Sequence, residues 1–254
     1  NNALDLTNWF TPGNGDTDFK QLIAANIKGS DEPEILGLHS QLSSYNPNAA
    51  FDESVFYNLS NIDLNQFTPI TLVNRDYEYA LASDAAGLLH LVEPKDFDIL
   101  ASIKGCDTEL GAISNVRINN SLDVAMAICG QQLLSWVVEY DPNIQDYGYS
   151  LYALASHDLG DADTSTAKLV SIETSDLETH LFTLLKNKFH RYLLNKDLGV
   201  DGDNDGVLNY KDIFPIDATQ WADSDLDGYG DNPVPANNPD PSLNDIDNDG
   251  VLDN

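Results

Sequence analysis

Three stretches near the end of the chain repeat one pattern of aspartates followed by glycine. They begin at Asp201, Asp223 and Asp245, so successive units are 22 residues apart. Each has aspartate at positions 1, 3 and 5, glycine at position 6 and an oxygen-bearing side chain at position 9. Alternate carboxylates in a tightly turned loop point toward one centre, and the glycine permits the sharp turn. These residue types at this spacing predict binding sites for a hard divalent cation, and calcium is the expected ion.

The predicted calcium ligands follow from the loop positions. The first unit supplies Asp201, Asp203, Asp205, the Val207 carbonyl, Asn209 directly or through water, and Asp212 at position 12. The second unit supplies Asp223, Asp225, Asp227, the Tyr229 carbonyl and Asp231. Its position 12 is Val234, so Asp217 and Asp240 are the candidates to complete it. The third unit supplies Asp245, Asp247, Asp249, the Val251 carbonyl and Asp253.

The third unit stops at Asn254, before a twelfth position is reached. We therefore expect the natural protein to continue through further units of 22 residues, and the third loop either to bind calcium more weakly here or to borrow ligands from a neighbouring unit or chain. An acidic linker that binds ions only diffusely is the alternative for the whole region. Three units in phase with a shared ninth position favour defined ion-binding sites. Without calcium, repulsion among the carboxylates should keep the region expanded.

The phased loops of residues 201–254 resemble thrombospondin type 3 repeats. The segment Ile213-Phe-Pro-Ile-Asp217, followed by Trp221-Ala-Asp223, is similar to the bacterial variant. The resemblance implies a calcium-wrapped spacer or surface module of an exported protein. Dockerins duplicate a loop of about this period and are the minor alternative, but their loops lead into helices. Prolines disfavour helices here, at Pro215, Pro233, Pro235, Pro239 and Pro241.

Charge and hydropathy exclude several classes of function. The 42 acidic residues outnumber the 12 basic ones and give a net charge of −30 in 254 residues, so nucleic acid and anionic membranes would be repelled. The longest apolar stretches fall far short of the roughly 20 residues of a membrane span. Residues 201–254 form a separate acidic region with 14 Asp, no Glu and a single base, Lys211.

Upstream of residue 200 the pattern is mostly that of strands. Short apolar runs separated by turn residues predict strands at 77–83, 88–93, 98–104, 112–118, 122–129, 132–140, 149–156 and 167–172. Such meanders resemble blades of a β-propeller over residues 67–173, with Tyr-x-Tyr-Ala-Leu-Ala-Ser at 77–83 and Leu-His-Leu-Val at 89–92. The region is too short for a closed propeller of four blades, so we expect an incomplete propeller or a β-sandwich.

A linking α-helix is predicted between the strands and the acidic region. Ser175 and Glu178 form a capping-box pattern. Apolar residues then recur at helical spacing, at Leu177, Leu181, Leu184, Leu185, Phe189, Tyr192 and Leu193. The predicted organisation is therefore a mainly β protein with four parts: 1–66, a loop-rich segment with a short helix from Asp18 to Ile27; 67–174, a β-meander domain; 175–200, the linking helix; and 201–254, the calcium-binding repeats.

No catalytic motif is visible, and an enzyme is the less favoured reading. The five histidines form no close metal pair, and nucleophile, phosphate-binding and dinucleotide motifs are missing from the sequence. We expect an exported, extracellular or cell-surface protein with an adhesive or structural role, whose partners are calcium and other surface proteins, copies of itself or polysaccharide. A secreted hydrolase of polysaccharide or peptide with an accessory calcium-binding region is the alternative.

The two cysteines, Cys106 and Cys129, are too few for a disulfide framework. Free buried thiols and a single bridge agree equally well with the cysteines alone. Because both lie near the ends of strands that are neighbours in the predicted meander, we predict that they are bridged in the exported protein.

Overall fold

A computed structural model describes residues 20–26, 34–38, 42–45, 62, 64–72, 78–93, 98–118, 122–140, 148–160, 164, 166–173, 179–186, 188–233, 235–237 and 239–241. Over these residues the fold is mainly β, with four antiparallel sheets, one 3₁₀ turn at Lys196–Gly199 and no α-helix. Each sheet is a meander, because its strands pair in chain order. Within the same ranges no helix is long and apolar enough to span a membrane.

The four sheets follow one another along the chain. Sheet 1 consists of β1 (Gln21–Ala25), β2 (Glu34–Leu38) and β3 (Leu42–Tyr45). Sheet 2 consists of β4 (Leu64–Thr71), β5 (Glu78–Asp84), β6 (Leu88–Glu93) and β7 (Asp98–Lys104). Sheet 3 consists of β8 (Ile113–Ile118), β9 (Leu122–Cys129), β10 (Gln132–Tyr140) and β11 (Tyr149–Asp158). Sheet 4 consists of β12 (Lys168–Glu173), β13 (Thr179–Leu185) and β14 (Lys188–Leu193).

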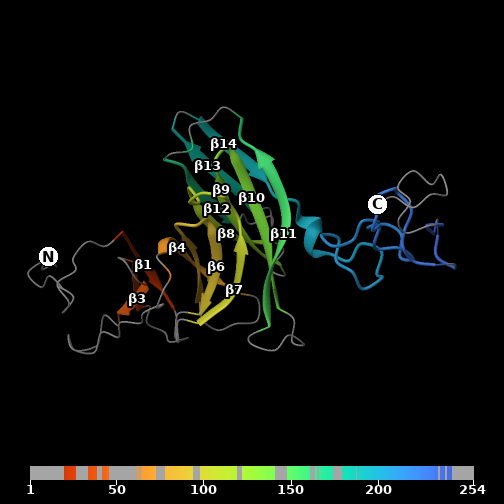
Figure 1. The fold of residues 1–254 in the computed structure, drawn as a ribbon, viewed down its shortest axis with the longest axis horizontal. Coiled ribbons are helices and arrows are strands. Elements are labelled where there is room, and N and C mark those ends of the chain that lie inside the picture. Colours follow the sequence, from red (N-terminus) through yellow and green to blue (C-terminus); the bar gives the residue numbers. More distant parts are fainter. Residues whose placement is uncertain are drawn as a thin grey trace, which may run out of the picture.

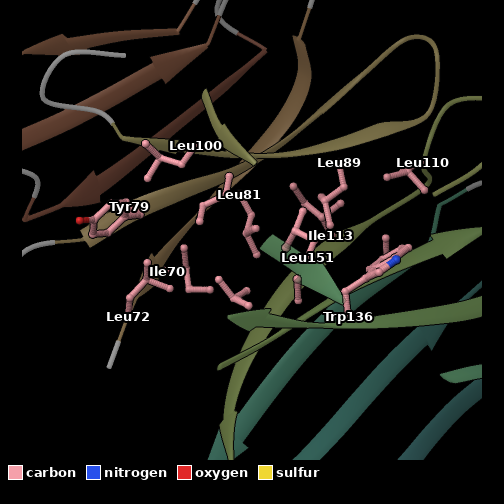
Figure 2. Packing of buried hydrophobic residues seen from close by; sticks show 14 of the residues in the cluster. Ile70, Leu72, Tyr79, Leu81, Leu89, Leu100, Leu110, Ile113, Trp136 and Leu151 are labelled. Atoms are coloured by element: carbon pink, nitrogen blue, oxygen red, sulfur yellow. The ribbon is translucent and has the colours of Figure 1, made fainter. Parts of the chain in front are cut away.

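The sheets stack face to face, and a hydrophobic core fills each interface (Figure 1). Phe67 and Leu36 belong to the core between sheets 1 and 2. Leu89 and Trp136 belong to the core between sheets 2 and 3, which Figure 2 shows from close by. Leu181 joins sheet 4 to the core on the other face of sheet 3. Sheets 2 and 3 are therefore covered on both faces.

Strand β9 illustrates why these segments form buried strands. Val124 and Met126 point into the core shared with sheet 4, whereas Ala125 and Ala127 point into the core shared with sheet 2. Side chains alternate between the two faces of a strand, so a run that is apolar at every position suits a strand buried on both faces. In the sequence Leu-Asp-Val-Ala-Met-Ala-Ile-Cys every residue is apolar except Asp123, which pairs with Arg117, and β9 is an inner strand of sheet 3.

A disulfide between Cys106 and Cys129 joins sheet 2 to sheet 3. Cys106 follows β7 and Cys129 ends β9, and their Cα atoms are 5.6 Å apart. The predicted bridge is therefore confirmed. A cross-link that spans 23 residues restricts the unfolded chain, which the chain-entropy account values at about 3 kcal/mol.

His90 fastens the turn between β5 and β6 to strand β7. Its Nδ1 atom lies 2.7 Å from the Ser102 hydroxyl, and its Nε2 atom lies 3.4 Å from a carboxylate oxygen of Asp84. Burial lowers the pKa of the imidazole, and the Asp84 carboxylate opposes this shift only in part. The Asp84 carboxylate also accepts hydrogen bonds from the amides of Ala86 and Leu88. Asp84 and His90 together therefore stabilise the turn.

Both predicted helices are wrong. Residues 179–185 and 188–193 of the expected 175–200 helix are strands β13 and β14, and residues 21–25 of the expected Asp18–Ile27 helix are strand β1. Leu181, Thr183 and Leu185 are buried while Leu184 is exposed, which is a period of two. The apolar spacing fits either period, and packing against sheet 3 favours the strand because it buries one face of the strand through Leu181 and Leu185.

The other predictions for the sheets agree with the structure to within two residues at most boundaries. The strands expected at 88–93, 98–104, 122–129 and 132–140 are β6, β7, β9 and β10. Strand β4 begins at Leu64, so the meander starts slightly before the expected boundary at residue 67. The N-terminal segment, expected to be rich in loops, contributes sheet 1.

Gly87 in the β5–β6 turn provides a test of this packing. Its φ is +80°, and a Cβ atom there would lie 2.2 Å from the Thr108 carbonyl oxygen and 2.4 Å from that of Cys106. We predict that Gly87→Ala lowers the free energy of unfolding by about 2–4 kcal/mol in urea denaturation, from backbone strain and this clash.

Gly130→Ala is the matched control. Gly130 also has a positive φ, of +55°, but nothing lies within 4 Å of its added Cβ atom. This control should cost only about 1 kcal/mol of strain. Equal losses in the two variants would show that the close approach at Gly87 is not part of the fold.

Candidate metal centre

Three aspartates of the first loop bring their carboxylate oxygens together. Asp201, Asp203 and Asp205 each contribute one oxygen, and these oxygens all lie within 4.8 Å of one another. Two unit charges 4 Å apart repel by about 1 kcal/mol in water and by more where water is excluded. A divalent cation at the centre replaces this repulsion by attraction. The group could therefore hold a metal ion.

The backbone of the first loop curls around this group. Asn204 has φ +65° and Gly206 has φ +97°. Asp201 Oδ2 accepts a hydrogen bond from the Gly206 amide at 2.9 Å, and Asp205 Oδ1 accepts one from the Val207 amide at 2.7 Å. Asp201 also accepts from the Asp205 amide through its Oδ1 atom at 3.2 Å, whereas Asp205 Oδ2 has no hydrogen-bond partner and is available for a ligand.

The second loop repeats this geometry. Asp223, Asp225 and Asp227 form the second group of converging oxygens. Asp223 Oδ2 accepts from the Gly228 amide at 2.9 Å, and Asp227 Oδ1 accepts from the Tyr229 amide at 2.7 Å. Position 4 again has a left-handed backbone, with φ +66°.

In the second loop the residue at position 4 is Leu226, and this left-handed backbone conformation is energetically unfavourable for leucine. A left-handed backbone costs a residue other than glycine about 1–2 kcal/mol, and asparagine, the residue at position 4 of the first loop, tolerates it better than leucine. The side chain of Leu226 is also exposed, so its burial does not offset the cost. The arrangement of the aspartates, which the two loops share, therefore determines this backbone.

Asp212 closes the first loop from position 12. Its side chain is only 7% exposed, and its Oδ2 atom is buried without a hydrogen-bond partner. Burial raises the pKa of this carboxyl, and the neighbouring Asp205, Asp203 and Asp201 raise it further. The Oδ2 atoms of Asp203 and Asp205 are likewise buried and unpaired. Buried oxygens without a donor are what an oxygen-ligated cation requires, so the residues present fit such an ion.

Position 9 closes each loop by hydrogen bonds. Asn209 Oδ1 accepts from the Gly202 amide at 2.9 Å, and Asp231 Oδ1 accepts from the Ser224 amide at 3.0 Å. The second oxygen of Asp231 accepts from the Ser224 hydroxyl at 2.6 Å. Both position 9 side chains, predicted as ligands, therefore serve to join the ends of their loops. At position 7, the Val207 and Tyr229 amides donate into the loops as described above.

The two candidates to complete the second loop have different surroundings. Asp217 Oδ1 accepts hydrogen bonds from the Thr219 amide and hydroxyl and from Asn237, and the Thr219 hydroxyl is the main cause of its lowered pKa. Asp240 lies beside the loop, because its amide donates to the Gly230 carbonyl at 2.8 Å. Val234 lies outside the described residues, and so does the third loop with Asp245, Asp247, Asp249, Val251 and Asp253.

Gln220 organises the segment between the two loops. It is 1% exposed, and its amide group bonds the Asn232 and Asn237 carbonyls and the Asn232 amide at 2.8–3.1 Å. These bonds hold the second loop against the turn that precedes it. The sequence gives little sign of this role, because a single glutamine has no repeat partner at the matching position of the first unit.

Contacts at positions 10 and 11 attach the first loop to sheet 3. The Tyr210 hydroxyl donates to Glu139, and Lys211 Nζ lies 2.5 Å from the same carboxylate. The Lys211 ammonium also lies 5.4 Å from the centre of the Tyr152 ring. Burial and the Glu139 carboxylate raise the pKa of Tyr210. The loop that carries the aspartates is thus anchored to strands β10 and β11.

No family model matches the chain, and no curated protein matches it by sequence. Among solved structures it is similar to the β-propeller domain of Myceliophteria thermophila Cps50 (Swd1), with a TM-score of 0.43 and 11% identity over 65% of this chain and 55% of that chain. It is also similar to BBS1N in complex with ARL6DN, in a crystal soaked with lead, with a TM-score of 0.36 and 8% identity over 67% of this chain and 64% of that chain. The chain thus spans less than two thirds of these distant β-propeller neighbours.

The ligand assignment for the first loop can be tested with Asp205 and Asp217. Asp225→Asn and Asp247→Asn first disable the other two loops. In this background we predict that Asp205→Ala weakens calcium affinity by at least roughly tenfold, about 1.4 kcal/mol, because it removes a carboxylate of the converging group.

Asp217→Ala in the same background should leave the first-site affinity unchanged, because Asp217 bonds Thr219 and Asn237. Isothermal calorimetry gives both affinities. Equal losses in the two variants would mean that the assignment of ligands is wrong.

Proposed function

We propose that the chain is an exported calcium-binding protein with a surface, adhesive or structural role. Its Asp-rich repeats form a calcium-rigidified stalk on a body of stacked β-sheets. The observation that carries this proposal is one ligand geometry built twice, 22 residues apart, from sequences that share little beyond the aspartates and the glycine. The buried, unpaired Oδ2 atom of Asp212 supports a cation at the first site.

Ligand chemistry favours calcium over other metals. Residues 201–254 contain no histidine or cysteine, so softer ions find no nitrogen or sulfur ligand there. Magnesium requires near-ideal octahedral geometry and gives up its water reluctantly. Calcium accepts six to eight oxygens in flexible geometry, which suits several carboxylates together with backbone carbonyls and water.

The attachment of the first loop to the β-sheet body supports a stalk. The first loop is anchored through Tyr210 and Lys211 to Glu139, and the repeats extend away from the sheets beyond that point (Figure 1). Described residues after both loops form turns and no helix, which agrees with thrombospondin type 3-like repeats better than with dockerins.

An extracellular location is supported by the disulfide. Disulfides persist in oxidising compartments, and Cys106 and Cys129 are bridged. Calcium modules of extracellular proteins typically bind with dissociation constants of about 10⁻⁴–10⁻³ M, so an affinity in this range is expected for the proposed sites.

Small-angle X-ray scattering tests the stalk. In chelator the repeats should be expanded, because their carboxylates repel one another. On addition of about 5 mM calcium, above the affinity range of such modules, we predict a saturable decrease in the radius of gyration and in the flexibility of the particle.

The control variant combines Asp203→Asn with Asp225→Asn, which removes one carboxylate from each described loop. It should lose most of the calcium response, while circular dichroism of the β-sheets stays unchanged. Identical scattering of the unmodified protein in calcium and in chelator would refute the stalk.

A further inference from the structure

The aspartate at position 5 of each described loop is followed directly by glycine, which gives the pairs Asp205-Gly206 and Asp227-Gly228. The main-chain nitrogen of a residue can attack the side-chain carboxyl of an aspartate before it. A glycine leaves this attack unhindered, because it has no Cβ atom. Both glycines are exposed, and nothing lies within 4 Å of a Cβ atom added to either of them. Space and access to water therefore permit the reaction at these two pairs.

The reaction rearranges the main chain in two steps and needs only water. In the first step the Gly206 nitrogen bonds to Asp205 Cγ, and the carboxyl hydroxyl leaves with the amide hydrogen as water, which closes a succinimide ring. In the second step water breaks one of the two bonds between the ring nitrogen and a carbonyl carbon. Opening at Cγ restores aspartate, whereas opening at the main-chain carbonyl gives isoaspartate.

In the folded loop both reacting groups are held in other hydrogen bonds. The Gly206 amide donates to Asp201 Oδ2 at 2.9 Å, and Asp205 Oδ1 accepts from the Val207 amide at 2.7 Å. The second loop has the same two bonds at the matching positions. To close the ring, the glycine amide must leave the carboxylate at position 1 and turn its nitrogen toward the aspartate at position 5. The folded loop therefore opposes the reaction.

An empty loop opens more readily than a loop that holds an ion. Oxygens of Asp201, Asp203 and Asp205 converge within 4.8 Å, and the Oδ2 atom of Asp212, a residue only 7% exposed, is buried without a hydrogen-bond partner. Without a counter-charge these carboxylates repel one another. Opening relieves the repulsion and releases the glycine amide, and the reaction then proceeds from the open population.

We propose that Asp205 and Asp227 are sites of isoaspartate formation, and that calcium suppresses this modification by keeping the loops closed. The inference rests on the proposed function, because calcium binding supplies the protection.

The modification ends calcium binding at the loop in which it occurs. Isoaspartate adds one methylene group to the main chain and removes it from the side chain. The carboxylate at position 5 then no longer reaches the oxygens of Asp201 and Asp203 with which it converges. Each loop that rearranges therefore loses a ligand, and the extent of modification records the time that the protein has spent without calcium.

Mass spectrometry with electron-transfer fragmentation tests the proposal, because it distinguishes isoaspartate from aspartate at a given position. The full chain is kept for several weeks at neutral pH and 37 °C, either in millimolar calcium or in chelator. Isoaspartate at Asp205 and Asp227 should accumulate at least roughly tenfold faster in chelator, because the open population is larger there. Rates are expressed relative to deamidation of Asn14-Gly15, a pair that lies outside the aspartate repeats. Calorimetry on the protein aged in chelator and returned to calcium should show a reduced binding capacity.

The matched control combines Asp203→Asn with Asp225→Asn, which keeps both Asp-Gly pairs and removes one carboxylate from each described loop. In calcium this variant should form isoaspartate nearly as fast as the unmodified chain does in chelator.

Calorimetry on the fresh protein separates the two ways in which the account can fail. Equal rates in calcium and in chelator, in protein that binds calcium, would overturn this inference and leave the proposed function intact. The same holds for full protection of the double variant by calcium, or for aspartate that stays unmodified in chelator. Protein that binds no calcium would overturn the proposed function, and this inference with it.

Discussion

Mutual repulsion among carboxylates is the constraint on which the acidic region of this molecule, residues 201–254, depends. Three carboxylates meet within 4.8 Å in each described loop, and in the first loop a fourth, from Asp212, is buried beside them. Such a group is stable only with a counter-charge at its centre. The backbone adapts to the group: Leu226 takes a left-handed conformation that leucine disfavours, in the same way as Asn204 in the first loop. The aspartate groups of the two described loops could therefore hold a metal ion, and in the proposed function that ion is part of the fold of this region.

The β-sheet body buries its apolar surface by packing the faces of its sheets against one another. Stacking places three hydrophobic cores between four sheets, and the disulfide ties the two middle sheets together. The repeats are attached to this body, since Glu139 on β10 accepts a hydrogen bond from Tyr210 and forms a salt bridge with Lys211. In the proposed calcium-bound form, ordering of the first loop and docking of that loop on β10 would support each other.

Sequence alone predicts the parts of this structure that depend on local repetition. The Asp loops follow from spacing, and strands such as β6 and β9 follow from turn residues around apolar runs. A helix was expected where leucines fit both periods, and only strand pairing within sheet 4 and packing of that sheet on sheet 3 decide in favour of strands β13 and β14. The Tyr210–Glu139 contact joins residues 71 positions apart, and no local pattern indicates it. The loop-closing hydrogen bonds of Asn209 and Asp231 depend on orientation, which residue type does not determine.

The central claim is that calcium orders the aspartate loops and their attachment to the body. Amide hydrogen exchange followed by mass spectrometry measures this most directly, because the Gly206, Val207 and Gly228 amides donate to loop carboxylates. Calcium at saturating, millimolar concentration should slow exchange in residues 201–212 and 223–231 by at least roughly tenfold, while exchange in β9 stays unchanged. Equal exchange of these loops in calcium and in chelator would contradict the account.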